Sequence, residues 1–195
     1  GLYNEVIKGQ RKVASEGISI DSIGIDTWGC DFAFFGADGQ LLGMPHCYRD
    51  QHTDGAQEKF FAKMPAAEVY KRTGIQFMNF NSLFQLDTIK RNGGQALEHA
   101  DKILFIPDAL IYMLTGKAIC EYTVASTSQM LNPMTGDLDA EILEALGIPR
   151  EKFGVMTQPG TVAGTLTEQV QEATGLGAVP VIAVAGHDTG SAVAA

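Results

Sequence analysis

Two short polar clusters hold the residues that could carry chemistry. Each follows an apolar run, and together they offer carboxylates, an imidazole, a hydroxyl group, an indole and glycine. A carboxylate can accept a proton from a reacting hydroxyl group, and a glycine lets a ligand approach the backbone closely. The first cluster contains Asp26, Trp28, Gly29 and Asp31, and the second contains His187, Asp188 and Thr189.

A third motif, Tyr48-Arg49-Asp50, combines an aromatic ring with two opposite charges. An aromatic face can stack on the C–H face of a polyhydroxyl compound, and charged groups form strong hydrogen bonds with its hydroxyls. The motif therefore suits a sugar-like ligand. A surface salt bridge between Arg49 and Asp50 explains the same residues and remains an open alternative.

Simpler structural roles also remain open for the carboxylates of the two clusters. Asp188 precedes G-S-A-V-A-A and could cap a helix, and Asp26 could cap a turn. Nothing in the chain matches a nucleophile elbow G-x-S-x-G, a zinc-binding H-E-x-x-H or a Walker lysine loop. The 22 glycines never form G-x-G-x-x-G, so the residues alone give no argument for nucleotide binding.

Two predicted strands deliver the two clusters. Ile18–Asp26 is rich in β-branched residues, and Val179–Ala185 is an uninterrupted apolar run, typical of a strand covered on both faces in a parallel or mixed sheet. Pro180 is tolerated because it lies among the strand's first residues. In open α/β sheets ligands bind just beyond the carboxyl ends of the strands, so we expect a ligand site there.

Further elements complete an order of sheet, helical insertion and sheet. A strand over Cys30–Phe35, a hairpin turn at Ala37–Gln40 and a strand over Leu41–Tyr48 precede the insertion. A capping box formed by Asp54 and Gln57 starts the helical part. Caps, apolar spacing and terminal glycines predict helices over Leu2–Ala14, Ala66–Arg72, Asn81–Gly93, Pro107–Gly116, Asp139–Leu146 and Glu168–Thr174, and Thr161–Thr165 predicts another strand.

The composition argues against several classes of partner. The net charge is −9 and the 14 lysines and arginines are scattered, which argues against a nucleic-acid footprint and against binding to anionic membranes. No apolar stretch approaches the ~18 residues of a membrane span, and no signal peptide is recognisable. Cys30, Cys47 and Cys120 form no C-x-x-C pair, so we expect reduced thiols packed as small apolar residues in a cytoplasmic protein.

Several longer strings, in order along the chain, resemble the FGGY carbohydrate kinases. They are D-S-I-G-I-D-T-W-G-C-D-F, Y-R-D, R-T-G-I-Q-F-M-N-F-N-S-L-F-Q-L, I-P-D-A-L-I-Y-M-L-T-G, E-Y-T-x-A-S-T and A-G-H-D-T-G-S-A-V. The resemblance implies an α/β lobe of the ribonuclease H-like (actin/hexokinase-like) fold with a helical insertion. It also implies a kinase that uses ATP and Mg²⁺ and phosphorylates a small ketose, L-rhamnulose, at its C1 hydroxyl.

The resemblance also implies a role for each candidate residue. Asp188 is expected to be the general base. The residues expected to bind the sugar or to lie near it are Gly29, His187, Asp188, Thr189, Asp26, Trp28, Asp31, Arg49 and Asp50. A side chain at Gly29 would occupy the space of the sugar.

Kinases of this family open with a hairpin that holds the ATP phosphates and finish with a second lobe that binds adenine. The resemblance therefore implies that residues 1–195 are an incomplete N-terminal FGGY-kinase domain, truncated at both ends and inactive alone. A kinase for another ketose or polyol and a non-catalytic carbohydrate-binding module remain alternatives. So does a ribonuclease H-like nuclease with two metals on Asp26, Asp31 and Asp188, although the charge of −9 argues against it.

Overall fold

A computed structural model describes residues 1–195, except for the side chain of residue 194. None of the described helices is long and apolar enough to cross a membrane. The elements, in chain order, are α1 (Leu2–Ser15), β1 (Ile23–Gly24), β2 (Phe32–Phe35), η1 (Gln51–Thr53), α2 (Ala56–Phe61), α3 (Ala66–Thr73), α4 (Ser82–Arg91), α5 (Gln95–His99), β3 (Lys102–Phe105), α6 (Ile106–Thr115), β4 (Ile119–Glu121), α7 (Tyr122–Ser126), β5 (Leu131–Asn132), β6 (Asp137–Leu138), α8 (Ala140–Leu146), η2 (Arg150–Lys152), β7 (Val155–Thr157), β8 (Thr161–Thr165), α9 (Glu168–Thr174), β9 (Pro180–Ala183) and α10 (Asp188–Ala194).

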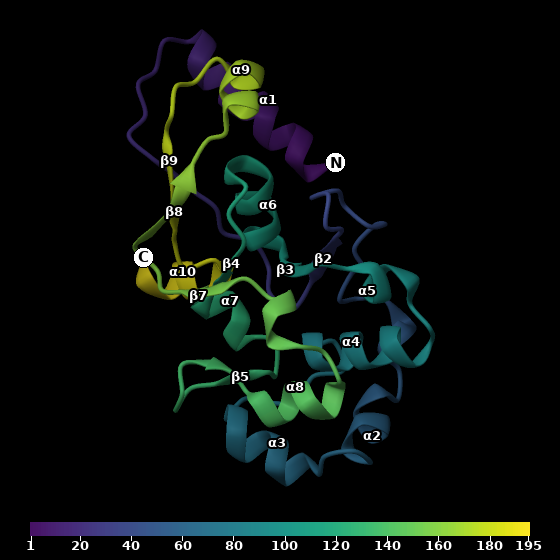
Figure 1. The fold of residues 1–195 in the computed structure, drawn as a ribbon. Helices are drawn as coiled ribbons and strands as arrows, with labels where there is room; N and C mark the ends of the chain where they lie inside the picture. Colours follow the sequence, from purple (N-terminus) through teal and green to yellow (C-terminus); the bar gives the residue numbers. More distant parts are fainter.

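Strand β9 lies at the centre of a three-stranded mixed sheet with the order β1-β9-β8. It pairs in parallel with β1, where Ile23 faces Val181, and antiparallel with β8. Pro180 is the first residue of β9, where a missing N–H is tolerated. Helices α1 and α9 pack against each other at one end of this sheet (Figure 1). The prediction of a parallel or mixed sheet around this strand is confirmed, and the sheet is mixed. The strand is not equally covered on both faces, because Val181 and Ala183 are buried whereas Pro180 and Ile182 are half-buried.

Helix α6 runs through the middle of the molecule and joins its small sheets (Figure 1). It begins with Pro107 in its first turn and ends at Gly116, whose φ of +69° suits a left-handed cap. Ile111 and Leu114 pack in one core with Val181 of β9. Ala109 packs in another, beside the antiparallel pair β2–β3. The helix therefore buries two faces, which explains its high apolar content.

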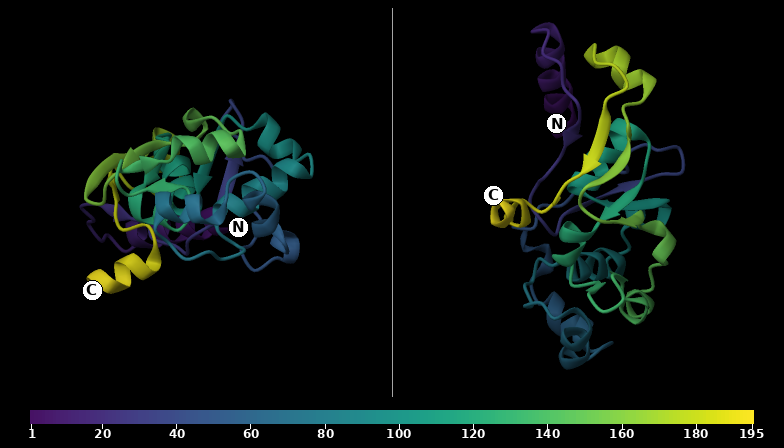
Figure 2. Two further views of the ribbon diagram at one scale, coloured as in Figure 1. Left: turned by 90° about the horizontal axis from the view of Figure 1, so that it is seen from below. Right: turned by 90° about the vertical axis from the view of Figure 1, so that its left-hand side faces the viewer.

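The helical insertion forms the other end of the molecule, away from α1 and α9 (Figure 2). Its core is built around Phe60 of α2, Phe84 and Leu86 of α4, and Ile142 of α8, all fully buried. Helix α4 is buried along the whole of residues 82–89 because other elements surround it. The predicted order of sheet, helical insertion and sheet is confirmed.

Of the two helix starts predicted from an aspartate, one is confirmed and one is wrong. Asp139 accepts the N–H groups of Glu141 and Ile142 and starts α8 as predicted. The capping box of Asp54 and Gln57 is wrong, because Gly55 occupies the cap of α2 with φ at +67°. Other predicted helices deviate only at their ends.

Asn81 does hold the cap position of α4, but its side chain does not bond to that helix. It accepts the N–H of Met78 at 2.7 Å and donates to the carbonyl of Thr127 at 2.9 Å. The asparagine therefore connects two loops beside α4 instead of capping the helix.

Two predicted strands are much shorter than the sequence indicates. From Ile18–Asp26 only Ile23–Gly24 pair with β9, since the rest has no neighbouring strand. From Leu41–Tyr48 only Leu41 forms a bridge, to Phe35, because Gly43 at φ +78° interrupts the extended backbone. The predicted turn at Ala37–Gln40 is confirmed by a 2.9 Å hydrogen bond from Gly36 N–H to the carbonyl of Gln40.

The cysteine prediction holds for two of the three thiols. Cys30 and Cys120 are buried and unpaired, as expected for small apolar residues. Cys47 is exposed, because it lies in the irregular loop that replaces the predicted strand.

Gly154 provides a test of the packing between β4 and β7. A Cβ added there would overlap the backbone of Ile119, which cannot move away without breaking the parallel pair. We expect Gly154→Ala to lower the free energy of unfolding by about 1–3 kcal/mol, measured by urea denaturation. Gly177→Ala is the matched control because open space surrounds that position. Equal stability of the two variants would contradict this packing.

Candidate functional site

The carboxyl ends of β1 and β9 are joined by backbone hydrogen bonds just beyond the strands. Thr27 donates its N–H to the carbonyl of Gly186 at 2.9 Å, and Asp188 donates its N–H to the carbonyl of Thr27 at 2.8 Å. Thr27 and His187 thus form a parallel bridge that extends the sheet by one residue pair. The bridge brings the two polar clusters of the sequence together.

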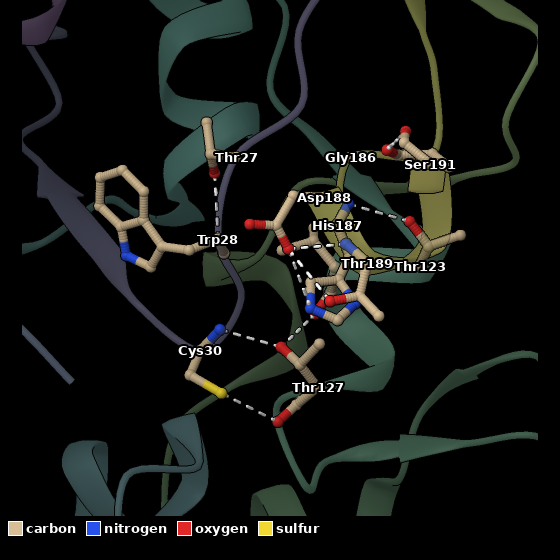
Figure 3. A network of polar contacts seen from close by, with 12 residues as sticks. Thr27, Trp28, Cys30, Thr123, Thr127, Gly186, His187, Asp188, Thr189 and Ser191 are labelled. Carbon is tan, nitrogen blue, oxygen red and sulfur yellow. Dashed lines mark hydrogen bonds and ion pairs between the residues drawn. The ribbon is translucent and has the colours of Figure 1, made fainter. Parts of the chain in front are cut away.

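A buried carboxylate, Glu121, fixes the backbone behind this bridge. Its side chain accepts the N–H groups of Thr123 and Val124, both at 2.9 Å, and so caps α7. The same carboxylate accepts the N–H of Gly186 at 3.0 Å. The Thr123 hydroxyl donates to Glu121 at 2.6 Å. It also accepts the N–H of His187 at 3.2 Å (Figure 3). One carboxylate therefore positions both α7 and the segment that leads into α10.

A cavity of about 540 Å³ opens in front of these residues. Its volume lies in the range of small-molecule sites. The residues that line it are Trp28, Gly29, Cys30, Tyr48, Ile75, Gln76, Phe80, Asn81, Ser126, Thr127, His187, Asp188 and Thr189. Aromatic rings, amides and hydroxyls make up most of this lining, and none of these lining residues is a lysine or an arginine. The cavity therefore favours a neutral polar ligand.

Asp188 presents one carboxylate oxygen to the cavity. Its Oδ1 accepts the N–H of Thr189 at 2.6 Å and the Thr189 hydroxyl at 3.3 Å, and lies 3.5 Å from Nε2 of His187. Oδ2 receives no hydrogen bond from the described residues, and in Figure 3 it points away from Thr189. The side chain is 54 % exposed. The arrangement holds the carboxylate from one side and leaves the other oxygen available to a ligand.

The alternative that Asp188 is the N-cap of the last helix is wrong. His187 holds the N-cap of α10, and Asp188 is the first residue of that helix. Its carboxylate bonds only to the adjacent Thr189 and to no N–H farther along the helix.

Asp31 lies behind the cavity wall instead of in the cavity. It is 2 % exposed and accepts three donors: the indole N–H of Trp28 at 2.8 Å, the backbone N–H of Tyr48 at 3.1 Å and the amide of Gln85 at 3.1 Å. Tyr48 in turn meets the ring of Phe80 edge to face at 5.3 Å. Asp31 therefore orients the aromatic residues that line the cavity.

The structure gives a new reason for the glycine at position 29. A Cβ there would lie 2.8 Å from Cγ2 and Oγ1 of Thr127, so the first obstacle is this threonine and not a ligand. Thr127 Oγ1 accepts the N–H of Cys30 at 2.9 Å. Cys30 has a φ of +70°, unusual for a residue with a side chain. The Gly29-Cys30 backbone thus turns sharply against α7.

Besides Asp31, three residues expected near the sugar do not line the cavity. Asp26 is exposed and borders a separate hollow beside α1. Arg49 donates to the hydroxyl of Tyr48 at 2.9 Å and stacks on its ring. Asp50 accepts the N–H of Cys47 at 3.3 Å and lies 3.7 Å from Nδ1 of His46. The salt bridge between Arg49 and Asp50, offered as the alternative, does not form either.

The structure also tests the proposed set of metal ligands and shows which cavity residues the sequence did not predict. Asp26, Asp31 and Asp188 do not gather into a metal-binding group among the described residues, so the nuclease arrangement is not formed. Cavity residues that the sequence did not single out are Ile75, Gln76, Phe80, Asn81, Ser126 and Thr127. They come from the loop before α4 and the end of α7, where no local pattern marks a binding residue.

Comparison with known proteins defines the class. Residues 3–194 match the FGGY family of carbohydrate kinases, N-terminal domain, and the chain belongs to this family. A rhamnulokinase of Bacteroides thetaiotaomicron is 62% identical over 194 residues, which are 100% of this chain and 40% of that protein. A rhamnulokinase of Pectobacterium atrosepticum is 40% identical over 98% of this chain and 38% of its own length. The chain thus spans about two fifths of these curated relatives.

Solved structures show the same fold at low sequence identity. Gluconate kinase from Lactobacillus acidophilus superposes with a TM-score of 0.85 at 21% identity, over 93% of this chain and 37% of that one. Plasmodium falciparum glycerol kinase with ADP superposes with a TM-score of 0.80 at 20% identity, over 94% of this chain and 38% of that one. The predicted α/β lobe of the actin- and hexokinase-like sugar kinases is confirmed.

The role of Glu121 can be tested with its amide. In Glu121→Gln one oxygen becomes an NH₂ group, which cannot accept a hydrogen bond. Either Thr123 N–H, which bonds to Oε1, or the N–H groups of Val124 and Gly186, which bond to Oε2, then lose their acceptor. We expect a loss of about 1–3 kcal/mol in the free energy of unfolding, since buried donors lose their acceptor. Glu172→Gln, on the exposed face of α9, is the matched control. The assignment fails if the two variants unfold at the same urea concentration.

A second carboxylate, Asp108 of α6, lies beside Glu121 and accepts its N–H at 3.2 Å. Burial raises the pKa of Asp108 well above its usual range, and the charge of Glu121 adds to this. Because the folded state holds the proton more tightly, this group stabilises the fold below about pH 3.9 and loses that contribution as the pH rises toward the raised pKa.

We therefore expect Asp108→Asn to gain stability relative to the parent protein as the pH rises from about 4 to about 7. Urea denaturation of both proteins across this range measures the difference. Parallel stability curves would show that Asp108 does not titrate in the folded protein with a raised pKa.

Proposed function

We propose that this chain is the sugar-binding, N-terminal part of a kinase that phosphorylates L-rhamnulose at its C1 hydroxyl to L-rhamnulose 1-phosphate. The identity of 62% to the Bacteroides thetaiotaomicron rhamnulokinase supports the choice of substrate. The observation that carries the reaction is the free Oδ2 of Asp188, presented to a cavity with neutral, polar and aromatic walls.

Asp188 is the general base of this proposal. As the C1 oxygen of the sugar attacks a phosphoryl group, its proton passes to the carboxylate, and the phosphoryl group leaves its donor. Phosphoryl transfer depends on the positioning of the nucleophile, and a carboxylate within reach of the hydroxyl can orient it and accept its proton. Thr189 and His187 hold Oδ1 and so direct Oδ2 to the substrate.

The cavity walls supply the recognition of the sugar. Trp28 and Tyr48 offer aromatic faces to its C–H groups, while Gln76 and Asn81 offer amides to its hydroxyls. Gly29, His187 and Thr189 line the same cavity and are proposed as substrate contacts. The proposal gives Asp31 the role of orienting Trp28 and Tyr48, and does not include Asp26, Arg49 or Asp50.

The lining residues fit a neutral sugar and do not fit a triphosphate. No positively charged lysine or arginine lines the described cavity, and such cations commonly balance phosphate charge. We therefore assign no residue of this chain to ATP or Mg²⁺, which the family implies, and propose that other parts of the protein hold them. In this proposal residues 1–195 are an incomplete N-terminal domain. The unpaired cysteines agree with a reducing cytoplasm.

Replacement of Asp188 by asparagine tests the general base. In the full-length protein, Asp188→Asn keeps the size of the side chain but cannot accept the proton. We expect kcat to fall by about 10²–10⁴-fold while KM for L-rhamnulose changes far less. A coupled assay of ADP release measures both constants.

Asp26→Asn is the matched control because Asp26 follows the neighbouring strand but lies outside the cavity. Near-normal kcat in Asp188→Asn, with a lower melting temperature, would make Asp188 a structural residue. A parent protein that binds L-rhamnulose in calorimetry yet releases no ADP would be a carbohydrate-binding module. Preferential turnover of another ketose or polyol would keep the kinase and change its substrate.

A further inference from the structure

His46, Asp50 and His52 form a cluster outside the cavity. Each offers one ligand atom, and these atoms lie within 4.8 Å of one another. Nδ1 of His46 is 3.7 Å from Oδ2 of Asp50. The imidazole rings of His46 and His52 stack with their centres 4.5 Å apart and their planes 28° apart. The three residues come from one short stretch of chain that ends in η1.

His52 gives a second, independent sign that the cluster lacks a partner. Both of its ring nitrogens are shielded from solvent, and neither finds a hydrogen-bond partner among the described residues. Buried polar atoms are normally paired, because an unpaired one loses its bonds to water and gains none. An imidazole in this condition needs either a bound water or a cation on its nitrogen lone pair.

From this arrangement we propose that His46, Asp50 and His52 bind a divalent transition-metal ion of the zinc type. Two imidazoles and one carboxylate suit Zn²⁺, Co²⁺ or Ni²⁺, whereas Mg²⁺ prefers oxygen ligands alone. Neighbouring ligands of a tetrahedral zinc ion with bonds of about 2.0–2.1 Å are roughly 3.3 Å apart. In this proposal, rotations of the exposed His46 and Asp50 side chains toward the half-buried His52 give that spacing, and water completes the coordination.

The position of the cluster gives the ion a structural effect on the cavity. Tyr48 lies between His46 and Asp50 in the chain and lines the cavity wall. Its backbone N–H is held by Asp31 at 3.1 Å. A metal that links His46 to His52 encloses Tyr48 in a closed loop, so the aromatic wall becomes more rigid when the ion is bound.

Titration of the tag-free, full-length protein with ZnCl₂ in a calorimeter tests the proposal, with MgCl₂ as the comparison. We expect one saturable zinc site per chain and none for magnesium, and visible absorption of tetrahedral type when CoCl₂ is used. His46→Ala, His52→Ala and Asp50→Asn should each lower the zinc affinity at least about tenfold. Asp50→Asn is nearly isosteric and remains informative if a histidine variant fails to fold.

The matched controls are His99→Ala, an exposed histidine at the end of α5, and Cys47→Ser in the same loop. Both should keep the zinc affinity of the parent protein. Absence of saturable zinc binding overturns the proposal. So does a site that persists in His52→Ala and Asp50→Asn, or one that disappears in either control.

Discussion

The geometry of the site depends on one buried carboxylate, that of Glu121. A carboxylate in the interior is tolerated only when hydrogen-bond donors surround it, because it has lost its water. Here the donors come from the start of α7 and from Gly186, which follows β9. The hydrogen bonds of one carboxylate therefore hold together two elements that are far apart in the chain. Glu121 also holds the Thr123 hydroxyl, which in turn accepts the backbone N–H of His187. The position of the candidate site therefore depends on this carboxylate.

Elements with a strong local pattern could be predicted from the sequence. Strand Thr161–Thr165 and helix Glu168–Thr174 both lie where the sequence pattern places them. The ends of the helix are determined locally, because Thr167 caps its start and Gly175 ends it. The strand expected over Leu41–Tyr48 is wrong beyond Leu41, because apolar residues form a strand only beside a partner strand. Gly43 turns the chain away after one bridge, and no local signal shows that a neighbouring strand is absent there.

Part of the candidate site could be predicted from the sequence, because the strand that precedes it has a clear local pattern. The apolar run before His187 marks a strand, and its carboxyl end is a ligand position in any α/β sheet, so Asp188 could be singled out. Sequence alone could not separate Asp31 from Asp188, because both are aspartates next to a glycine-containing turn. Only tertiary contacts distinguish them: the buried Asp31 accepts three hydrogen bonds, whereas the side chain of Asp188 is 54 % exposed. Gln76 has no local signal, since a loop from the insertion carries it to the cavity.

The bridge between Thr27 and His187 has a consequence for how the chain acquires its structure. It connects residues near the two ends of the chain, and β1 has no strand partner other than β9 among the described elements. Contacts of such large sequence separation form slowly, because the intervening chain must be ordered or looped first. During synthesis Ile23–Gly24 leaves the ribosome long before β9 exists. The core of the helical insertion includes residues of β2 and β3 but none of β9, so the insertion can fold in the interval. The cavity is therefore completed only after β9 has formed, because His187, Asp188 and Thr189 of its lining follow that strand.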